Sequence, residues 1–179
     1  KIVRTFIETF MHGNARSFME LLPETVMEDA VKSLGLSEDM VIAQLDEQFQ
    51  NLHTEMEDEF GEGWSYTYSI QSVEPISEQE LQEKMQEYRE EKCALEIKEG
   101  KRFSLNVEVK GSEDTEKDDI NIDLIKVGKK WYLDIVALAV GYGAVQFNDA
   151  GMANVSDNMM GSLYCIIIVA VSAMGFIVG

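Results

Sequence analysis

The chain has 179 residues, of which 33 are acidic and 15 basic, so its net charge is −18, and 45% of its residues are hydrophobic. This length allows one ordinary domain and an appendage, and the hydrophobic content is enough to build one core. The negative charge repels phosphate backbones, which are bound by clustered lysine and arginine, so the composition argues against nucleic acid as a partner.

Three helices are predicted at the start of the chain. Apolar residues recur at helical spacing over 2–10, and Gly13 supplies a left-handed stop. A short second helix is predicted over 15–22. A third opens at Pro23, which a first helical turn tolerates, and is expected to run to about residue 33.

A longer helix is predicted to follow Ser37, which is a good N-cap residue. Glu38 and Asp39 suit the positive end of the helix dipole. One apolar stripe runs along this helix and comprises Ile42, Leu45, Phe49, Leu52, Met56 and Phe60. This stripe is expected to face the core.

The apolar period then changes to two residues over 64–71, which predicts a strand with one buried face. Ser77 and Glu80 form a capping box that opens another helix, with apolar residues on its inner side. Three more strands are predicted by the same alternation, over 103–109, 120–124 and 131–135, the last after a turn at Gly128-Lys129. Helices first, then mostly hairpin-linked strands, indicate an α+β domain with N-terminal helices packed on an antiparallel sheet.

Two stretches resemble a known superfamily. They are "FIETFMHGNARSFMELLP" near the start and "IKVGKKWYLDI" near residue 130. Both are similar to the nuclear-transport-factor-two-like (cystatin-like) superfamily, especially its secreted and lipid-anchored bacterial members. The resemblance covers about residues 1–138 and rests on Phe6, Phe10, Gly13, Asn14 and Ala15, and on Gly128, Lys129, Trp131, Tyr132 and Leu133. It implies a curved, cone-like sheet, but no single function, because this superfamily includes isomerases, dehydratases and binding modules.

Enzymes of this superfamily place an Asp, His or Tyr inside the cone, which makes a few aromatic and imidazole side chains candidates for a ligand pocket. These candidates are Trp64, Tyr66, Tyr68, Tyr88 and His53. Aromatic residues at strand spacing are more often part of the core, and His53 is expected at the edge of the polar face of its helix. We therefore assign no catalytic residue and no cofactor from the sequence.

Two further groups of acidic residues have ordinary explanations. Asp123 and Asp134 alternate out of phase with the apolar strand residues, which predicts that they lie on the wrong face for an enclosed acid–base pair. The acidic clusters 55–59 and 113–119 could bind Ca²⁺, a hard cation that prefers oxygen ligands. The second cluster lacks the glycine and glutamate positions of a calcium-binding loop, so we expect solvated acidic surfaces and no metal site.

The final part of the sequence is apolar. A helix over 158–179 would rise roughly 33 Å, close to the thickness of a bilayer's hydrocarbon core. We expect a domain over 1–138, a linker over 139–157 and a transmembrane or buried helix over 158–179, with the membrane contacted through Leu163 to Gly179. The domain itself is expected to lie outside the cytoplasm.

These observations predict a membrane-tethered binding domain, without catalysis of its own, for a small molecule, a peptide or a partner protein. One alternative is an isomerase, dehydratase or hydrolase that uses a pocket in the same fold. Another is a structural spacer or oligomerisation domain.

Overall fold

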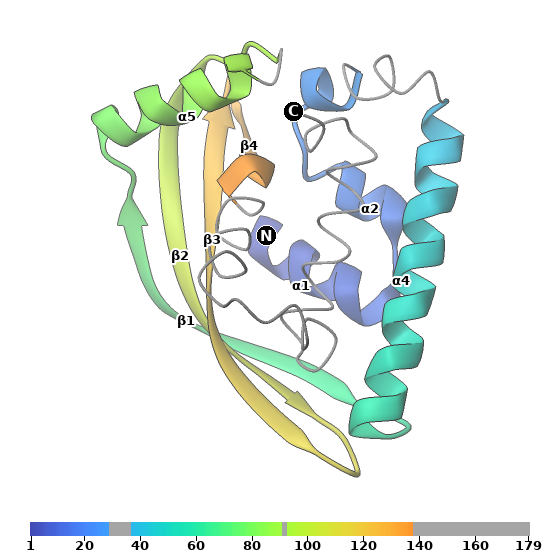
Figure 1. Ribbon diagram of the computed structural model, residues 1–179. Helices are drawn as coiled ribbons and strands as arrows, with labels where there is room; N and C mark the ends of the chain where they lie inside the picture. Colours follow the sequence, from blue (N-terminus) through green and yellow to red (C-terminus); the bar gives the residue numbers. More distant parts are fainter. Residues whose placement is uncertain (29–36, 91–92, 138–179) are drawn as a thin grey trace, which may run out of the picture.

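The computed structural model describes residues 1–28, 37–90 and 93–137, and it has the predicted α+β architecture (Figure 1). The elements occur in the order α1 (Ile2–His12), α2 (Ala15–Met19), α4 (Glu38–Phe60), β1 (Ser65–Pro75), α5 (Glu78–Glu90), β2 (Ile97–Lys110), β3 (Thr115–Val127) and β4 (Lys130–Leu133). Residues 24–28 are also helical. The predicted order of helices and strands is thus confirmed in the described residues.

The sheet is an antiparallel meander with the strand order β1-β2-β3-β4. It curves strongly along its strands (Figure 1). A bulge between Ile70 and Ser72 shifts the register of β1 against β2, and bulges increase the bend and twist of a strand. Ile70 is 49% exposed, so the buried alternation predicted for β1 weakens as the strand approaches the bulge.

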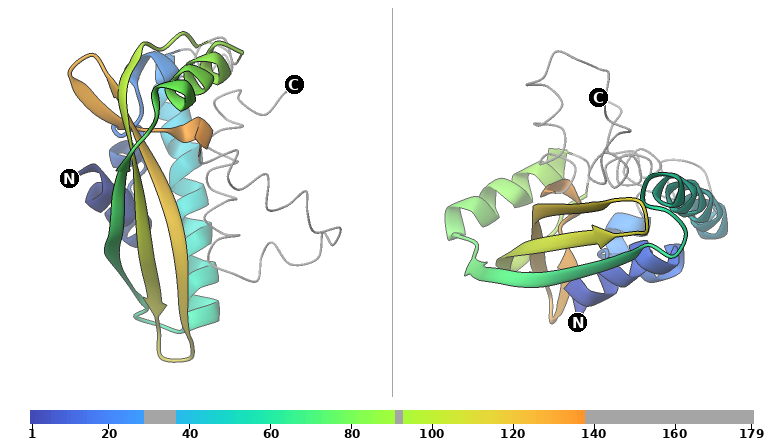
Figure 2. Two further views of the ribbon diagram at one scale, coloured as in Figure 1. Left: turned by 90° about the vertical axis from the view of Figure 1, so that its left-hand side faces the viewer. Right: turned by 90° about the horizontal axis from the view of Figure 1, so that it is seen from below.

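One face of the sheet packs against α1, α2 and α4 and forms the main core. Figure 2 shows α1 and α4 behind the sheet when its other face is turned to the viewer. The helices contribute the apolar stripe of α4 and the edge-to-face pair Phe18–Phe49, with ring centroids 6.2 Å apart. The stripe is as predicted from Leu45 onward, but at its start Val41 is buried and the predicted Ile42 is only half-buried. The strands contribute alternate residues such as Leu105 and Ile122.

The opposite face of the sheet is covered at one end by α5. Gly100, Arg102 and Asp123 alternate with the core-facing residues and therefore point away from α1 and α4. A Cβ atom on Gly100 would lie 2.8 Å from the side chain of Leu81, which shows how closely α5 approaches β2. The end of the sheet that contains Gly100 and Arg102 thus has helices on both faces (Figure 1).

Caps and turns fix the ends of the elements where the sequence predicts them. Gly13 has φ 60° and ends α1 in the left-handed conformation, and the Asn14 side chain accepts a hydrogen bond from the Ser17 N–H at the start of α2. The Ser37 hydroxyl accepts from Met40 N–H, and the Ser77 hydroxyl accepts from Glu80 N–H. These short-range signals set the helix starts.

Two backbone hydrogen bonds join parts of the chain that are far apart in the sequence. Glu113 N–H donates to the Phe60 carbonyl over 3.0 Å, so the β2–β3 turn packs on the end of α4. Leu133 N–H donates to the Leu21 carbonyl over 2.8 Å, which attaches β4 to the segment after α2.

Several predicted boundaries differ from the structure. The second helix ends at Met19, earlier than predicted, and the third is described only from Glu24 to Glu28. Strands β2 and β3 are longer than predicted because their polar ends continue the pairing beyond the apolar alternation. Ile135 lies after β4 and not in it.

The prediction of a transmembrane helix is wrong for the part of the chain that the structure describes. None of the helices there is both long and apolar enough to cross a membrane. The longest, α4, carries acidic residues in its first turn and near its end. The segments 139–157 and 158–179, predicted as linker and apolar helix, lie outside the described residues.

Candidate functional site

The side chains predicted to line a pocket are only partly brought together. His53 on α4 and Trp64 just before β1 form an edge-to-face pair with ring centroids 5.3 Å apart. Tyr66 and Tyr68 follow on β1 and are half-buried against the core. Tyr88 lies on α5, near the other end of the curved sheet, so it belongs to different surroundings (Figure 1).

Burial makes two of these phenols harder to ionise than a tyrosine in water. It raises the pKa of Tyr66, and the charges of Asp118 and Glu116 raise it further. Burial also raises the pKa of Tyr88 well above its usual value, and the charge of Asp134 acts in the same direction. Neither phenol is therefore prepared to act as a general base at neutral pH.

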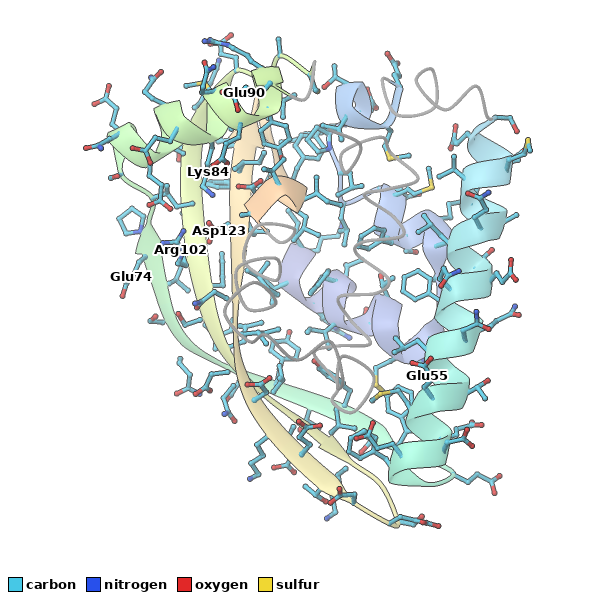
Figure 3. The ribbon with its side chains drawn as sticks, in the orientation of Figure 1. Glu55, Glu74, Lys84, Glu90, Arg102 and Asp123 are labelled. Atoms are coloured by element: carbon cyan, nitrogen blue, oxygen red, sulfur yellow. The ribbon has the colours of Figure 1, made fainter. Side chains whose placement is uncertain are left out.

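A buried ionic network lies between α5 and the sheet (Figure 3). Lys84 Nζ donates to Asp123 Oδ2 over 3.0 Å and to Asp134 Oδ2 over 2.8 Å. The other oxygen of Asp134 accepts from the Tyr88 hydroxyl over 2.9 Å and from the Ala137 N–H over 3.3 Å. Asp134 has no exposed surface, so all of its partners are supplied by the protein.

Arg102 extends this network towards solvent. Its Nε and Nη2 donate to the two oxygens of Asp123 over 2.8 and 2.7 Å, which is a bidentate pair. Nη2 also donates to Glu80 on α5. The network therefore joins α5 to β2, to β3 and to the residues after β4, and none of the buried side-chain polar atoms in the described residues lacks a partner.

The network keeps its groups charged. Burial alone would lower the pKa of Lys84, but the charges and hydrogen bonds of Asp134 and Asp123 outweigh it, so the pKa of Lys84 is raised. Burial alone would raise the pKa of Asp123, but the hydrogen bonds from Arg102 and the charge of Lys84 hold that pKa below its usual value. A protonated lysine that donates to two carboxylates is not available as a nucleophile or base.

The prediction that Asp123 and Asp134 lie on the wrong face for an enclosed pair is incorrect. The prediction assigned the correct face, because both side chains point away from the main core. That face is enclosed all the same, since α5 covers it. A signal is present in the sequence: Lys84 belongs to the spacing Leu81, Lys84, Met85, Tyr88, which marks the buried stripe of α5.

The low pKa of Asp123 predicts how stability depends on acidity. Its ionised form stabilises the fold above the unfolded pKa of about 3.9, and this contribution is lost as the pH falls through the lower folded pKa. We expect Asp123→Asn to cost stability at neutral pH and to cost progressively less below about pH 4. Urea unfolding of both proteins between about pH 2.5 and 7 measures this difference.

The exposed Asp119→Asn serves as the matched control for that experiment, since it removes the same charge from the same strand. Its effect reports the relief of general repulsion in an acidic chain. A cost of Asp123→Asn that stays constant at every pH would contradict the assigned role of the Asp123 charge.

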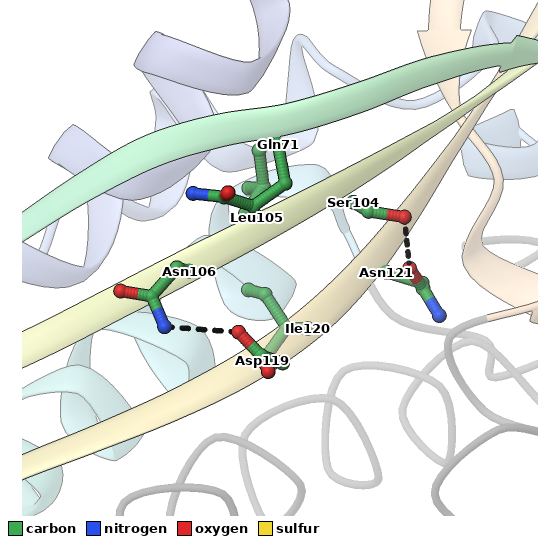
Figure 4. Close-up of a pocket in the computed structure, with 7 residues that line it drawn as sticks. All are labelled: Gln71, Ser104, Leu105, Asn106, Asp119, Ile120 and Asn121. Carbon is green, nitrogen blue, oxygen red and sulfur yellow. Dashed lines mark hydrogen bonds between the residues drawn. The ribbon is translucent and has the colours of Figure 1, made fainter.

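A polar hollow of about 620 Å³ lies on the open part of the same sheet face (Figure 4). Gln71, Ser104, Asn106, Asp119 and Asn121 contribute its polar groups. Ser104 donates to Asn121, and Asn106 donates to Asp119, so these side chains are already paired across β2 and β3. None of the described residues that line the hollow is aromatic, and they offer a ligand little apolar contact.

A second, larger groove of about 870 Å³ lies between the helices and the edge of the sheet at β4. We call it the β4 groove. Its apolar wall is formed by Ile2, Met19, Leu22, Met27, Trp131 and Tyr132, and its charged rim by Lys1, Arg16, Glu20, Glu24, Glu28, Glu38 and Lys130. The groove therefore combines half-buried aromatic and thioether side chains with charges of both signs.

Sequence reasoning missed the β4 groove because its walls come from four separate segments. Only Trp131 and Tyr132 stand out in the sequence, as part of a hairpin that matches a superfamily pattern. Within the described residues, no group of three or more His, Cys, Asp and Glu side chains could hold a metal ion.

Comparisons with known proteins leave the geometry as the only guide to function. No protein-family model, curated protein or solved structure matches this chain.

Proposed function

We propose that the chain is a binding domain for a segment of a partner protein, without catalysis of its own, and that the β4 groove is the binding site. The observation that carries this proposal is the composition of the groove wall, where Trp131 and Tyr132 lie half-buried beside methionine and leucine side chains. Rings that are partly accessible and already held in place lose little entropy when a ligand covers them.

The size and chemistry of the groove support a peptide segment. Its volume of about 870 Å³ is within the usual range for ligand sites of roughly 300 to 1,000 Å³. Met27, which is half-buried, provides flexible, polarisable surface that adapts to apolar side chains of different shapes. Charges on the rim leave the wall apolar and place the polar groups at the border, as in protein interfaces.

The buried ionic network supports the absence of catalysis. Lys84 and Arg102 together balance the charges of Asp123 and Asp134 beneath α5. None of these residues lines the β4 groove. Their arrangement suits the attachment of α5 to the sheet.

The cone-like form and the resemblance to the nuclear-transport-factor-two-like superfamily are retained as part of this proposal. A strongly curved antiparallel sheet with a long helix along its inner side supports them. Binding modules occur in that superfamily, which agrees with the proposed role.

A peptide selection tests the binding site. A random dodecapeptide phage library is selected on the immobilised chain, and enriched peptides are synthesised and titrated by fluorescence anisotropy. We expect Trp131→Ala to weaken their binding by roughly thirtyfold, because a central tryptophan typically contributes about 2 kcal/mol to an interface.

Tyr68→Ala is the matched control, since Tyr68 is another half-buried aromatic residue of the sheet but does not line the groove. Its effect on binding is expected to be less than about twofold once thermal unfolding shows that both variants are folded. Loss of binding in Tyr68→Ala with full binding in Trp131→Ala would move the site to the pocket predicted from the sequence. Failure to enrich any peptide would contradict the proposal.

A further inference from the structure

Lysines gather beside Trp131 in an otherwise acidic chain. Lys126, Lys129 and Lys130 belong to the β3–β4 hairpin, and Lys101 on β2 pairs with Leu124 of the neighbouring strand. We call Lys101, Lys126, Lys129, Lys130 and Trp131 the lysine–tryptophan patch. The whole chain has only 15 lysines and arginines against 33 acidic residues, so a cluster of four lysines is unexpected.

Two of these lysines are held over the tryptophan ring. Lys101 Nζ lies 5.2 Å and Lys126 Nζ 5.7 Å from the ring centroid of Trp131. An ammonium group at this distance is attracted by the negative face of an indole ring. The ring thus positions positive charge at the border of the β4 groove, to which Trp131 and Lys130 both belong.

Most of this charge is not neutralised by the described part of the chain. Lys126 pairs with Glu99. Lys101, Lys129 and Lys130 are exposed and form no salt bridge with any residue in the ranges 1–28, 37–90 and 93–137. Because carboxylates are so abundant in this chain, exposed lysines without one indicate a place where an external anion can bind.

Acidic residues from the segment after α2 also line the groove, namely Glu20, Glu24 and Glu28. Arg16 of α2 lies 3.9 Å from Glu38, another acidic residue of the lining. A bound segment therefore meets positive charge at the β4 end and negative charge at the α2 end. Complementary charges of this kind set the orientation of a partner and suppress wrong ones.

We infer that the segment bound in the β4 groove carries acidic residues where it crosses the lysine–tryptophan patch, an inference that rests on the proposed function. A short acidic peptide fits better than a long polyanion, because the patch is small and the net charge of −18 repels an anion that extends beyond it. Trp131 provides the apolar contact next to these charges, as an aromatic anchor does in an interface.

The test uses the highest-affinity dodecapeptide from the phage selection and a copy in which every Asp and Glu is replaced by Asn and Gln. The double variant Lys129→Ala/Lys130→Ala is compared with Lys110→Ala/Lys117→Ala, which has the same net charge but is altered at the other end of β2 and β3. Each peptide is titrated against each protein at about 50 and 300 mM NaCl, which changes the screening of exposed charges. An oligothymidylate of about 20 residues serves as the polyanion probe.

The selected peptide is expected to be acidic. Lys129→Ala/Lys130→Ala should weaken its binding by about three- to tenfold at the lower salt concentration, which corresponds to roughly 0.3 to 0.7 kcal/mol for each of two exposed ion pairs and lies within their usual range. The loss should shrink at the higher salt concentration because salt screens exposed charges. Lys110→Ala/Lys117→Ala should bind the selected peptide with an affinity within about twofold of that of the wild type. Lys129→Ala/Lys130→Ala should likewise bind the amide peptide within about twofold of the wild-type affinity.

The remaining outcomes separate the two proposals. A selected peptide that is neutral or basic, or one that binds both double variants equally, overturns the acidic segment. The groove remains the site in that case if Trp131→Ala still weakens binding by roughly thirtyfold. Oligothymidylate that binds as tightly as the peptide, with the same loss in Lys129→Ala/Lys130→Ala, replaces the peptide by a general polyanion. If no peptide is enriched, both proposals fail.

Discussion

Replacing Lys84 by alanine should lower the free energy of unfolding by about 3 to 5 kcal/mol, because removing one partner leaves buried charge uncompensated. Asp134 would keep its hydrogen bonds from Tyr88 and Ala137 but lose its only cationic partner among the described residues. Asp123 would keep Arg102, so most of the effect should come from Asp134. Urea unfolding followed by circular dichroism measures the change.

A second substitution separates lost charge from lost packing. Adding Asp134→Asn to Lys84→Ala removes the uncompensated charge, so the double variant should be more stable than Lys84→Ala alone. Lys117→Ala is the surface control: its pair with Glu108 is exposed, and such pairs contribute at most about 1 kcal/mol. If Lys84→Ala does not fold, Lys84→Gln retains a donor and allows the same comparison. Equal costs for Lys84→Ala and Lys117→Ala would contradict the role given to the network.

Replacing Gly111 by alanine should destabilise the protein by about 3 kcal/mol, the upper end of the usual cost of overpacking. A Cβ atom at this position would overlap the backbone carbonyl of Phe60 and lie 2.7 Å from the Phe60 Cβ. Backbone atoms cannot relieve this overlap by rotating away, as the end of a flexible side chain can. The β2–β3 turn would have to move away from the end of α4 and would lose the hydrogen bond from Glu113 N–H to the Phe60 carbonyl.

Gly63→Ala provides the comparison. Gly63 has φ 76°, which costs an L-residue about 1 to 2 kcal/mol, but a methyl group added there would meet no described atom within 4 Å. Thermal unfolding should show a larger loss of stability for Gly111→Ala than for Gly63→Ala. Hydrogen exchange of Gly111→Ala should show that the loss of protection is concentrated in the β2–β3 turn and the last turn of α4. A smaller loss for Gly111→Ala than for Gly63→Ala would mean that the turn does not pack on the helix end.

The elements of this fold could be predicted because their signals are local. Ser37 and Ser77 cap the helices that follow them, and the left-handed Gly13 ends α1, as their residue types indicate. Strand alternation likewise gave the phase of β2 and β3. The length of a strand was less predictable, because pairing continues through polar residues wherever a neighbouring strand is available.

The sites could not be predicted in the same way. The phase of Asp123 and Asp134 was correct, but whether their face meets water depends on α5, and nothing within the strands encodes that contact. Lys84 carried the missing information through its place in the buried stripe of α5. The β4 groove is assembled from segments that meet only after folding, so no single stretch of sequence reveals it.

The hydrogen bond from Leu133 N–H to the Leu21 carbonyl has a consequence for synthesis of the protein. It encloses nearly the whole domain in one loop, and contacts between such distant residues form late because the chain must first be brought together. On the ribosome, α1, α2 and α4 leave the exit tunnel long before β4 does. Their apolar faces therefore stay exposed until the final strand has been synthesised. A chaperone that covers these faces during this interval would protect the nascent chain from aggregation.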